Sequence, residues 1–305
     1  MTSASAIPAF RPRLERRRRA GQLFRTACLS AGVMAVIVLV VLLGRIVHAG
    51  WDWLTPTLLS NYPSELEPAT SGVKGALWGT IWLIALTALI AVPVGVGAAV
   101  YLQEYAPDNR LTRFIHLNIS NLAGVPSIVY GILGLAVFVR GFHVPILNRS
   151  TGMDRSIIAG ALTMSLLVLP VIIIATREAL AAVPSSIRLA AYALAATRWQ
   201  TIWHHVLPAA LPGIMTGIIL ALSRAIGEAA PLIMIGAVTW VAFVPKGLDD
   251  PFSALPLQIY NWSDRAQPEF RHLAAAAIIV LLVVLLTMNA VAIGIRTWQP
   301  RHRQW

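Results

Sequence analysis

Charged residues are scarce in this chain of 305 residues, and cysteine is almost absent. Only 12% of the residues are charged, about half the share that is usual in soluble domains. The hydrophobic share is 57%, and long apolar runs recur along the chain. The single cysteine, Cys28, excludes an internal disulfide framework. The composition therefore argues against a soluble domain and indicates a protein that crosses a membrane as helices.

Motifs for nucleotide and metal chemistry are missing as well. No G-x-x-x-x-G-K-[ST] phosphate-binding loop occurs, so any ATP hydrolysis requires another chain. No His-Glu-x-x-His zinc motif occurs either. The adjacent His204 and His205 would diverge on a helix, which is poor geometry for a shared metal. We expect no catalytic residue, no metal site and no cofactor bound by this chain.

The net charge of +11 is unevenly distributed, because many arginines precede the first apolar run. This placement is typical of the positive-inside bias and of contact with anionic lipid headgroups, and it argues against a nucleic-acid partner. The first apolar run is longer than that of a signal peptide, which disfavours cleavage. We expect residues 1–26 to form a disordered cytoplasmic tail. The arginines before the run are Arg11, Arg13, Arg16 to Arg19 and Arg25.

The apolar runs predict an all-α polytopic membrane protein with six transmembrane helices. Lys and Arg are more numerous on the side that holds both termini, so both termini are predicted to be cytoplasmic. No internal repeat is detectable, so the inverted-repeat architecture of many secondary transporters has no support. Residues 27–298 form the predicted permease domain and 299–305 a second tail. The predicted spans are residues 27–47, 75–102, 114–139, 155–175, 209–241 and 273–295.

Two of these spans have unusual composition. Gly75 and Gly79 give the second span a small-xxx-small face, which predicts a close contact with another segment. The third span is polar and rich in helix breakers, and such groups would be unsatisfied against lipid. Two compatible interpretations stay open: a helix buried against its neighbours, and a kinked helix that lines a cavity. The groups concerned include Asn118, Ser120, Asn121, Gly124, Pro126, Ser127 and Tyr130.

The fifth predicted span carries two charges, Arg224 and Glu228. They are four residues apart, so on a helix they share one face and can pair. Each alone would cost about 2.5–3.5 kcal/mol at membrane depth on insertion scales, so both should face the bundle interior or a water-filled cavity. The pair either locks two helices together or forms part of an anion path.

A polar segment, residues 177–208, separates the fourth and fifth spans. It is rich in strong helix formers, and Pro184 with the two serines after it provides a break and a helix start. Trp199, Ile202 and Trp203 fall on one helix face. We expect two or three short helices at the inner membrane surface. They form either a docking surface for another protein or an amphipathic loop that packs on the chain's own spans and on headgroups.

The run Leu189-Ala190-Ala191, three residues, Ala195, nine residues, His205, Val206, Leu207-Pro208 resembles the EAA loop of ABC importer permeases. In that family the loop forms the coupling helix that enters a cleft of the ATPase subunit. Leu189 stands where the family has Glu, Ala195 where it has Gly, and His205 where it has Ile. Because Gly tolerates positive φ and Ala does not, we expect a turn with negative φ at Ala195, or a helix that runs through it. The resemblance implies ATPase coupling by Leu189, Ala190, Ala191, Ala195, Arg198, Leu207 and Pro208.

Three further stretches are similar to the permeases of phosphate-specific ABC importers: Asn121–Gly134, Ser223–Leu232 and Leu255–Trp262. The last two resemble the A-type subunit (PstA-like) more than its C-type partner. The resemblance implies a transport subunit without its own ATPase site, forming half of a phosphate path in the cell (inner) membrane. The path residues it suggests are Arg224, Glu228, Ser127, Tyr130 and Asn121.

The resemblance also implies a set of partners. These are a C-type permease subunit, two ATP-binding subunits that bind ATP and magnesium, and an extracytoplasmic phosphate-binding protein. The alternatives are a permease for another oxyanion and a stand-alone secondary transporter, which would act without an ATPase. A membrane enzyme acting on lipid phosphate is a further class, but the sequence offers no nucleophile–base pair for it.

Overall fold

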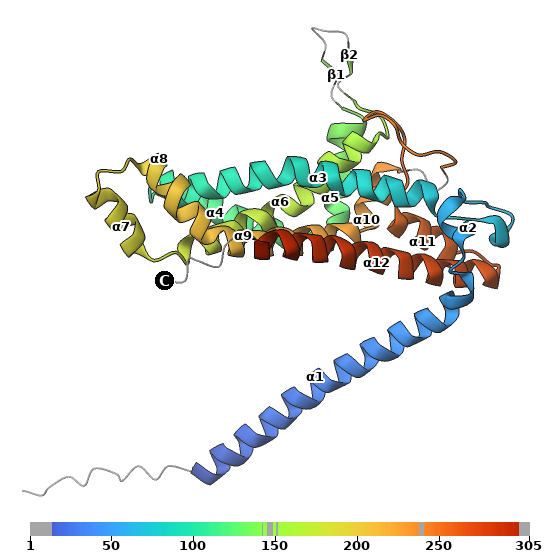
Figure 1. The fold of residues 1–305 in the computed structure, drawn as a ribbon, viewed down its shortest axis with the longest axis horizontal. Helices are drawn as coiled ribbons and strands as arrows, with labels where there is room; N and C mark the ends of the chain where they lie inside the picture. Colours follow the sequence, from blue (N-terminus) through green and yellow to red (C-terminus); the bar gives the residue numbers. More distant parts are fainter. Residues whose placement is uncertain (1–13, 142, 145–148, 151, 238–240, 299–305) are drawn as a thin grey trace, which may run out of the picture. The chain divides into compact units, whose positions relative to one another are not determined.

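The structure, a computed structural model, describes residues 14–141, 143–144, 149–150, 152–237 and 241–298 (Figure 1). The chain divides into a first unit, Met1–Ala49, and a second unit, Gly50–Trp305. The first unit holds almost all of helix α1 (Leu14–Gly50), and none of the 18 most apolar consecutive residues of this helix is buried within the chain.

Residues 14–26 are helical, so the expectation of a disordered tail is wrong for them. Leu, Arg and Ala favour helix, and extending an existing helix requires no new nucleus. The remaining tail residues, 1–13 and 299–305, lie outside the described residues.

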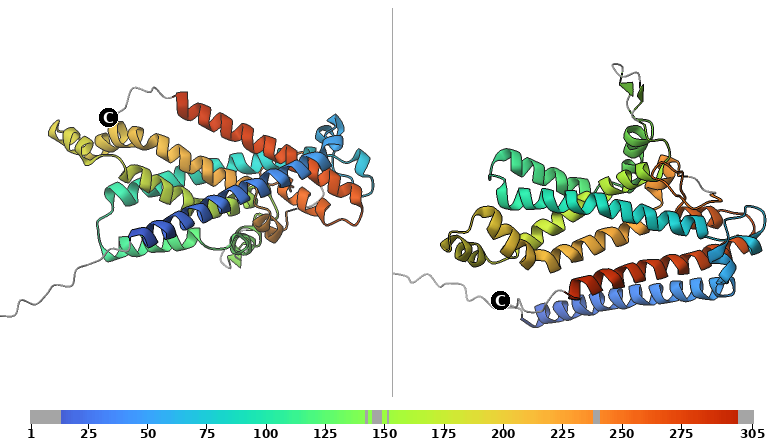
Figure 2. Two further views of the ribbon diagram at one scale, coloured as in Figure 1. Left: turned by 90° about the horizontal axis from the view of Figure 1, so that it is seen from below. Right: turned by 45° about the horizontal axis from the view of Figure 1, so that its top comes forward.

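The second unit is a bundle of long helices linked by short ones (Figures 1 and 2). Single π-helical turns extend α3 (Tyr101–Tyr105) and α5 (Leu135–Val139) and join α8 to α9 (Ile202–Val206). The described strands, β1 (His143–Val144) and β2 (Arg149–Ser150), pair in antiparallel fashion. The helices are α2 (Pro56–Ser60), α3 (Lys74–Val100), α4 (Arg110–Ala123), α5 (Ser127–Gly134), α6 (Ile157–Ala181), α7 (Ser185–Ala193), α8 (Arg198–Thr201), α9 (Leu207–Ile226), α10 (Ala230–Ile235), α11 (Leu255–Ser263) and α12 (Pro268–Trp298), with 3₁₀ turns at Trp51–Trp53 and Pro68–Thr70.

The helices that could cross a membrane agree in number with the predicted spans. Among the residues described by the structure, five helices are long and apolar enough to cross a membrane, or six if the bent pair α4–α5 is one span. The prediction of an all-helical polytopic membrane protein is therefore confirmed.

Helix α6 lies at the centre of the second unit, between α3 and α9. Two thirds of its apolar window (67%) is buried inside the chain, the largest share among the candidate spans. Close approach depends on small residues, since Gly217 of α9 faces Ala175 of α6 and Gly95 of α3 faces Ile172. The buried hydroxyls of Thr87, Thr163 and Ser165 bond to carbonyls one turn earlier, which satisfies these polar groups.

The glycine face predicted on the second span does make a close contact, on helix α3. A side chain at Gly79 would collide with the backbone carbonyl of Ser253, and one at Gly75 would lie 2.8 Å from the carbonyl oxygen of Val241. Next to Gly79, the Thr80 hydroxyl accepts a hydrogen bond from the Leu255 amide at 2.8 Å. The contact partner is thus the non-helical chain before α11, rather than a second long helix.

Candidate transport path and coupling loop

The third predicted span is sharply bent rather than straight. Helices α4 and α5 meet at 102° across the break at Gly124–Pro126. The Tyr130 hydroxyl donates to the Leu122 carbonyl at 2.8 Å, across this break. Tyr130 is only 6% exposed. The predicted kink is therefore present, and the hydroxyl of Tyr130, a predicted path residue, bridges it.

The predicted charge pair forms. Arg224 lies in the last turn of α9, and its Nε donates to Oε1 of Glu228 at 3.2 Å. The side chains are 53% and 21% exposed within the single chain, so the pair is open on one side. A small anion or a water molecule can therefore reach the guanidinium without any rearrangement of the helix that carries it.

The fifth predicted span, residues 209–241, is wrong as one helix. Helix α9 ends at Ile226, and α10 covers only Ala230–Ile235 before Gly236 at φ +75°. Pro231 lies in the first turn of α10, where its missing N–H costs least, so the chain restarts a helix there instead of continuing one. Glu228 therefore lies in the break, with its amide bonded to the Ala225 carbonyl at 3.2 Å.

The two broken spans pack against each other through α5 and α10. The fit is tight, because a side chain at Gly131 would lie 2.7 Å from the Pro231 Cα. Helix α5 begins directly after the bend, and α10 begins directly after the charge pair. The two helix breaks therefore precede two helices that pack against each other. Of the other predicted path residues, Asn121 is exposed in the last turn of α4, and Ser127 is the partly buried first residue of α5.

Sequence reasoning missed one polar contact beside the charge pair. The Ser223 hydroxyl donates to Oδ1 of Asn289 on α12 at 2.7 Å. This bond fixes the end of α9 against α12, one residue before Arg224. A lone Asn within the apolar run of α12 was the signal that could have identified it, since isolated polar groups at membrane depth need a partner.

The predicted docking loop, the polar segment of residues 177–208, departs from expectation at Ala195. Its φ is +57°, so the prediction of a negative φ is wrong, and α7 ends at Ala193 rather than running through. The Ala196 amide bonds to the Ala191 carbonyl at 3.1 Å and the Ala195 amide to the Tyr192 carbonyl at 2.9 Å. These two bonds form a Schellman motif, which demands a left-handed residue at the position of Ala195. The turn that the family makes with Gly is kept here with Ala.

This strain gives a prediction. Replacing Ala195 by Gly should stabilise the loop by about 1 kcal/mol, because a left-handed conformation costs an L-residue roughly that much. Amide hydrogen exchange at residues 191–197 should slow accordingly. Ala193→Gly is the matched control, since it lies in helical geometry and should instead destabilise by about 0.5–1 kcal/mol. Faster exchange in Ala195→Gly would contradict the assignment of the turn.

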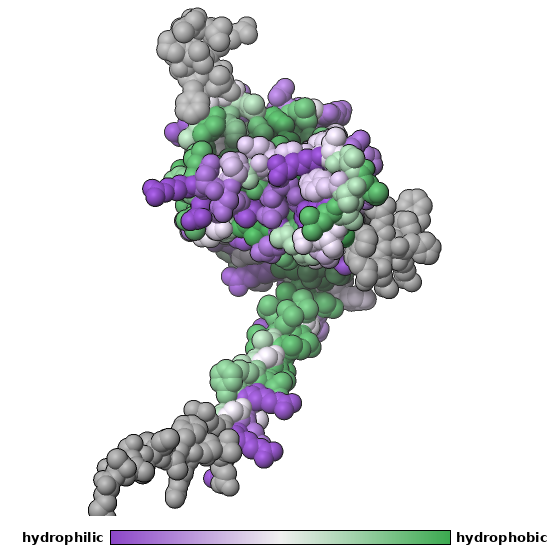
Figure 3. All heavy atoms as spheres, turned by 90° about the vertical axis from the view of Figure 1, so that its left-hand side faces the viewer, coloured by the Kyte–Doolittle hydropathy of each residue, from purple (hydrophilic) through white to green (hydrophobic). Residues whose placement is uncertain are grey.

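The predicted coupling residues are mostly accessible. Leu189 is 66% exposed, Ala190 is exposed, and Ala191 is buried. Arg198 lies over the Tyr105 ring at 5.6 Å. Figure 3 views the end of the second unit that carries α7 and α8, where hydrophilic residues gather between apolar sides. A polar end with a few exposed apolar side chains is a surface that another protein can dock on.

The polar segment is shorter than predicted. Residues 177–181 belong to α6, and α8, the π-helical turn and α9 form one helix from Arg198 to Ile226. Leu207 and Pro208 therefore lie inside this long helix. Pro208 lies in the first turn of α9, two residues after the π-helical turn ends. Trp199 and Trp203 stack at 5.4 Å, as their predicted shared face requires.

The family model for the inner membrane component of binding-protein-dependent transport systems matches residues 91–303. Among curated relatives, the chain is 36% identical to the phosphate transport system permease protein PstA 1 of Mycobacterium tuberculosis, over 97% of this chain and 93% of that one. It is 32% identical to the probable ABC transporter permease YqgI of Bacillus subtilis, over 87% and 90%.

Solved structures show the same fold. A chain of a bacterial alginate ABC transporter superposes with a TM-score of 0.65 at 17% identity, covering 92% of this chain and 96% of that one. A chain of the MetNI methionine ABC transporter gives 0.58 at 19% identity, covering 75% and 96%. The chain is thus a multi-pass inner membrane protein. It belongs to the family of inner membrane components of binding-protein-dependent transport systems.

Proposed function

We propose that this chain is the A-type permease subunit of an ATP-driven importer of inorganic phosphate and forms half of its path. The observation that carries the proposal is the open Arg224–Glu228 pair at a helix break, in a chain similar over nearly its whole length to phosphate permeases. A permease named PstC, from Mesorhizobium japonicum, aligns over only 64% of this chain, which favours the A-type role.

The chemistry of the pair suits phosphate. The planar, permanently charged fork of an arginine can bind two phosphate oxygens at once. Glu228 would repel phosphate, so its role is to hold Arg224 when no substrate passes. Phosphate displaces Glu228 from Arg224 as the path opens outward, and the carboxylate returns when phosphate leaves. Asn121 and Ser127, near the bend of α4 and α5, supply further hydrogen-bond donors.

The energy comes from other chains. Two ATPase subunits bind ATP and magnesium and close on the loop that holds Leu189, Ala190 and Ala195. A C-type permease forms the other half of the path, and an extracytoplasmic binding protein delivers phosphate. Both termini of this chain are then cytoplasmic, on the same side as α7.

Reconstitution tests the proposal. The chain is co-expressed with the three kinds of partner from a homologous system, and the complex is placed in liposomes with ATP on the side of the ATPase subunits. We expect uptake of radiolabelled phosphate that requires both the binding protein and an ATPase able to hydrolyse ATP. Uptake without any ATPase would instead indicate a secondary transporter. Stronger competition by phosphonate or arsenate than by phosphate would indicate a permease for another oxyanion.

A further inference from the structure

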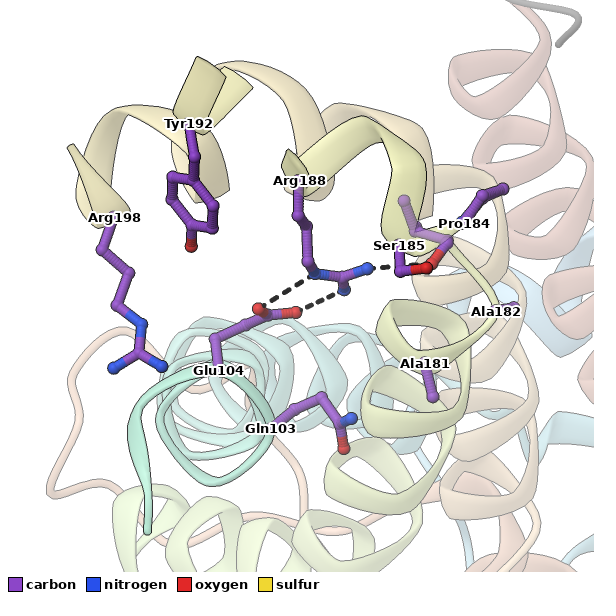
Figure 4. Close-up of a pocket in the computed structure, with 10 residues that line it drawn as sticks. Gln103, Glu104, Ala181, Ala182, Pro184, Ser185, Arg188, Tyr192 and Arg198 are labelled. Carbon is purple, nitrogen blue, oxygen red and sulfur yellow. Dashed lines mark hydrogen bonds and ion pairs between the residues drawn. The ribbon is translucent and has the colours of Figure 1, made fainter. Parts of the chain in front are cut away.

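A largely buried ion pair ties the docking loop to a distant helix end (Figure 4). Nη2 of Arg188, on α7, donates to Oε1 of Glu104 at 2.6 Å, and Nε donates to Oε2 at 3.2 Å. Glu104 lies in the π-helical turn that extends α3, 84 residues earlier in the chain. The side chains are only 19% and 9% exposed. Two parallel charge-assisted bonds fix orientation as well as distance.

The same guanidinium also holds the end of a third helix. Nη1 of Arg188 donates to the Val183 carbonyl at 2.8 Å, and Nη2 donates to the Leu180 carbonyl at 3.0 Å. Leu180 lies in the last turn of α6, where the helix dipole favours a cation. Arg188 therefore joins α7, the end of α6 and the end of α3 at one point.

Apolar contacts of α7 are few: Ile187 packs, partly buried, against the core, and α7 contacts the π-helical turn before α9. Within α7, whose residues are all described, only Ala191 is buried. A groove of about 620 Å³ lies beside the ion pair, between the end of α3 and helices α7 and α8. Gln103, Tyr192 and Arg198 line it, as Figure 4 shows. Apolar packing of α7 is therefore limited, and the Arg188–Glu104 pair is the described salt bridge that joins α7 to the end of α3.

We propose that the Glu104–Arg188 pair is the joint that passes movement of α7 to α3 and α6. The inference rests on the proposed function, because it assumes that an ATPase moves α7. Glu104 and Arg188 are positioning residues and touch no substrate. When α7 is displaced, two fixed bonds to Glu104 and two to the end of α6 pull both helices with it. These helices form the centre of the bundle, so the path moves with them.

The test compares variants in the reconstituted complex by phosphate transported per ATP hydrolysed. We expect Glu104→Gln to lower this ratio by at least about tenfold while ATP hydrolysis continues. A factor of ten corresponds to about 1.4 kcal/mol, which lies within the range of coupling energies between residues in contact. Asp108→Asn is the matched control. Asp108 pairs with Arg113 through one 3.4 Å contact, and both side chains are highly exposed, so its loss should leave the ratio unchanged.

A second variant protects the test against failed assembly. Glu104→Gln alone leaves Arg188 buried and without its counter-charge, which could disrupt the complex. The double variant Glu104→Gln/Arg188→Gln removes both charges and should assemble, yet remain uncoupled. Glu104→Asp should restore part of the coupling, because it restores the carboxylate.

Two outcomes are distinguishable. If the double variant assembles and transports phosphate per ATP as the unmodified complex does, the joint is not Glu104–Arg188 and the inference is overturned. If the unmodified complex itself shows no ATP-driven phosphate transport, the proposed function fails instead.

Discussion

Arg224→Gln should abolish phosphate uptake while the complex still assembles and hydrolyses ATP. Arg224 is the cation of the open pair at the end of α9, and glutamine is shorter but keeps a polar end group and removes the charge. A hydrogen bond to a charged group contributes about 1.5–3 kcal/mol, so losing a bidentate contact predicts at least about a 100-fold drop in uptake. Radiolabelled phosphate uptake at low concentration measures it.

Two further variants test whether the effect is specific to the charge and shape of Arg224. Arg113→Gln removes an arginine from an exposed pair elsewhere in the same unit and should leave uptake unchanged. Arg224→Lys keeps the charge but loses the planar fork, so intermediate uptake is expected. Normal uptake in Arg224→Gln would remove Arg224 from the path and leave the pair as a lock between α9 and the break after it.

Gly79→Ala should destabilise the protein strongly. The added methyl group would overlap the Ser253 carbonyl, and backbone cannot rotate away as a side chain can. Overpacking typically costs about 1–3 kcal/mol, and we expect the upper end of this range because the neighbouring Thr80–Leu255 bond would also be strained. The melting temperature of the detergent-solubilised complex should fall by several degrees.

Gly97→Ala is the matched control on the same helix. No atom lies within 4 Å of a side chain at Gly97, so the substitution should be neutral or slightly stabilising through helix propensity. Equal melting temperatures for Gly79→Ala and Gly97→Ala would show that α3 does not approach the chain before α11 as closely as described.

The local sequence pattern, meaning the apolar runs and the spacing of charged residues, was enough to predict the helical membrane class and the Arg224–Glu228 pair. Apolar runs of spanning length have few other solutions in lipid, and a spacing of four residues places two charges together whenever the chain is helical. The same reasoning failed where the helix stops. Gly227 and Pro231 signalled a break within the fifth span, but the apolar residues around them concealed it.

Contacts between distant segments were beyond local pattern. Nothing near Glu104 in the sequence indicates that it meets Arg188, because their pairing depends on how α3, α6 and α7 pack. The bond from Tyr130 to Leu122 likewise depends on the 102° bend. At Ala195 the spacing of the family motif was the better guide. Intrinsic preference predicted a negative φ, but the hydrogen bonds of the helix end impose the left-handed turn.

The π-helical turn at Ile202–Val206 has a consequence for how relatives of this chain can differ in length. A π-turn holds one residue more than the α-helical turn it replaces. Deleting one residue there can restore an α-helix without rotating the rest of α9. Deleting one residue later in α9, before Arg224, would turn the rest of the chain by about 100° around the helix axis and move the Arg224–Glu228 pair off the face it occupies. Natural single-residue gaps between the docking loop and the charge pair should therefore fall within Ile202–Val206, and those elsewhere should be selected against.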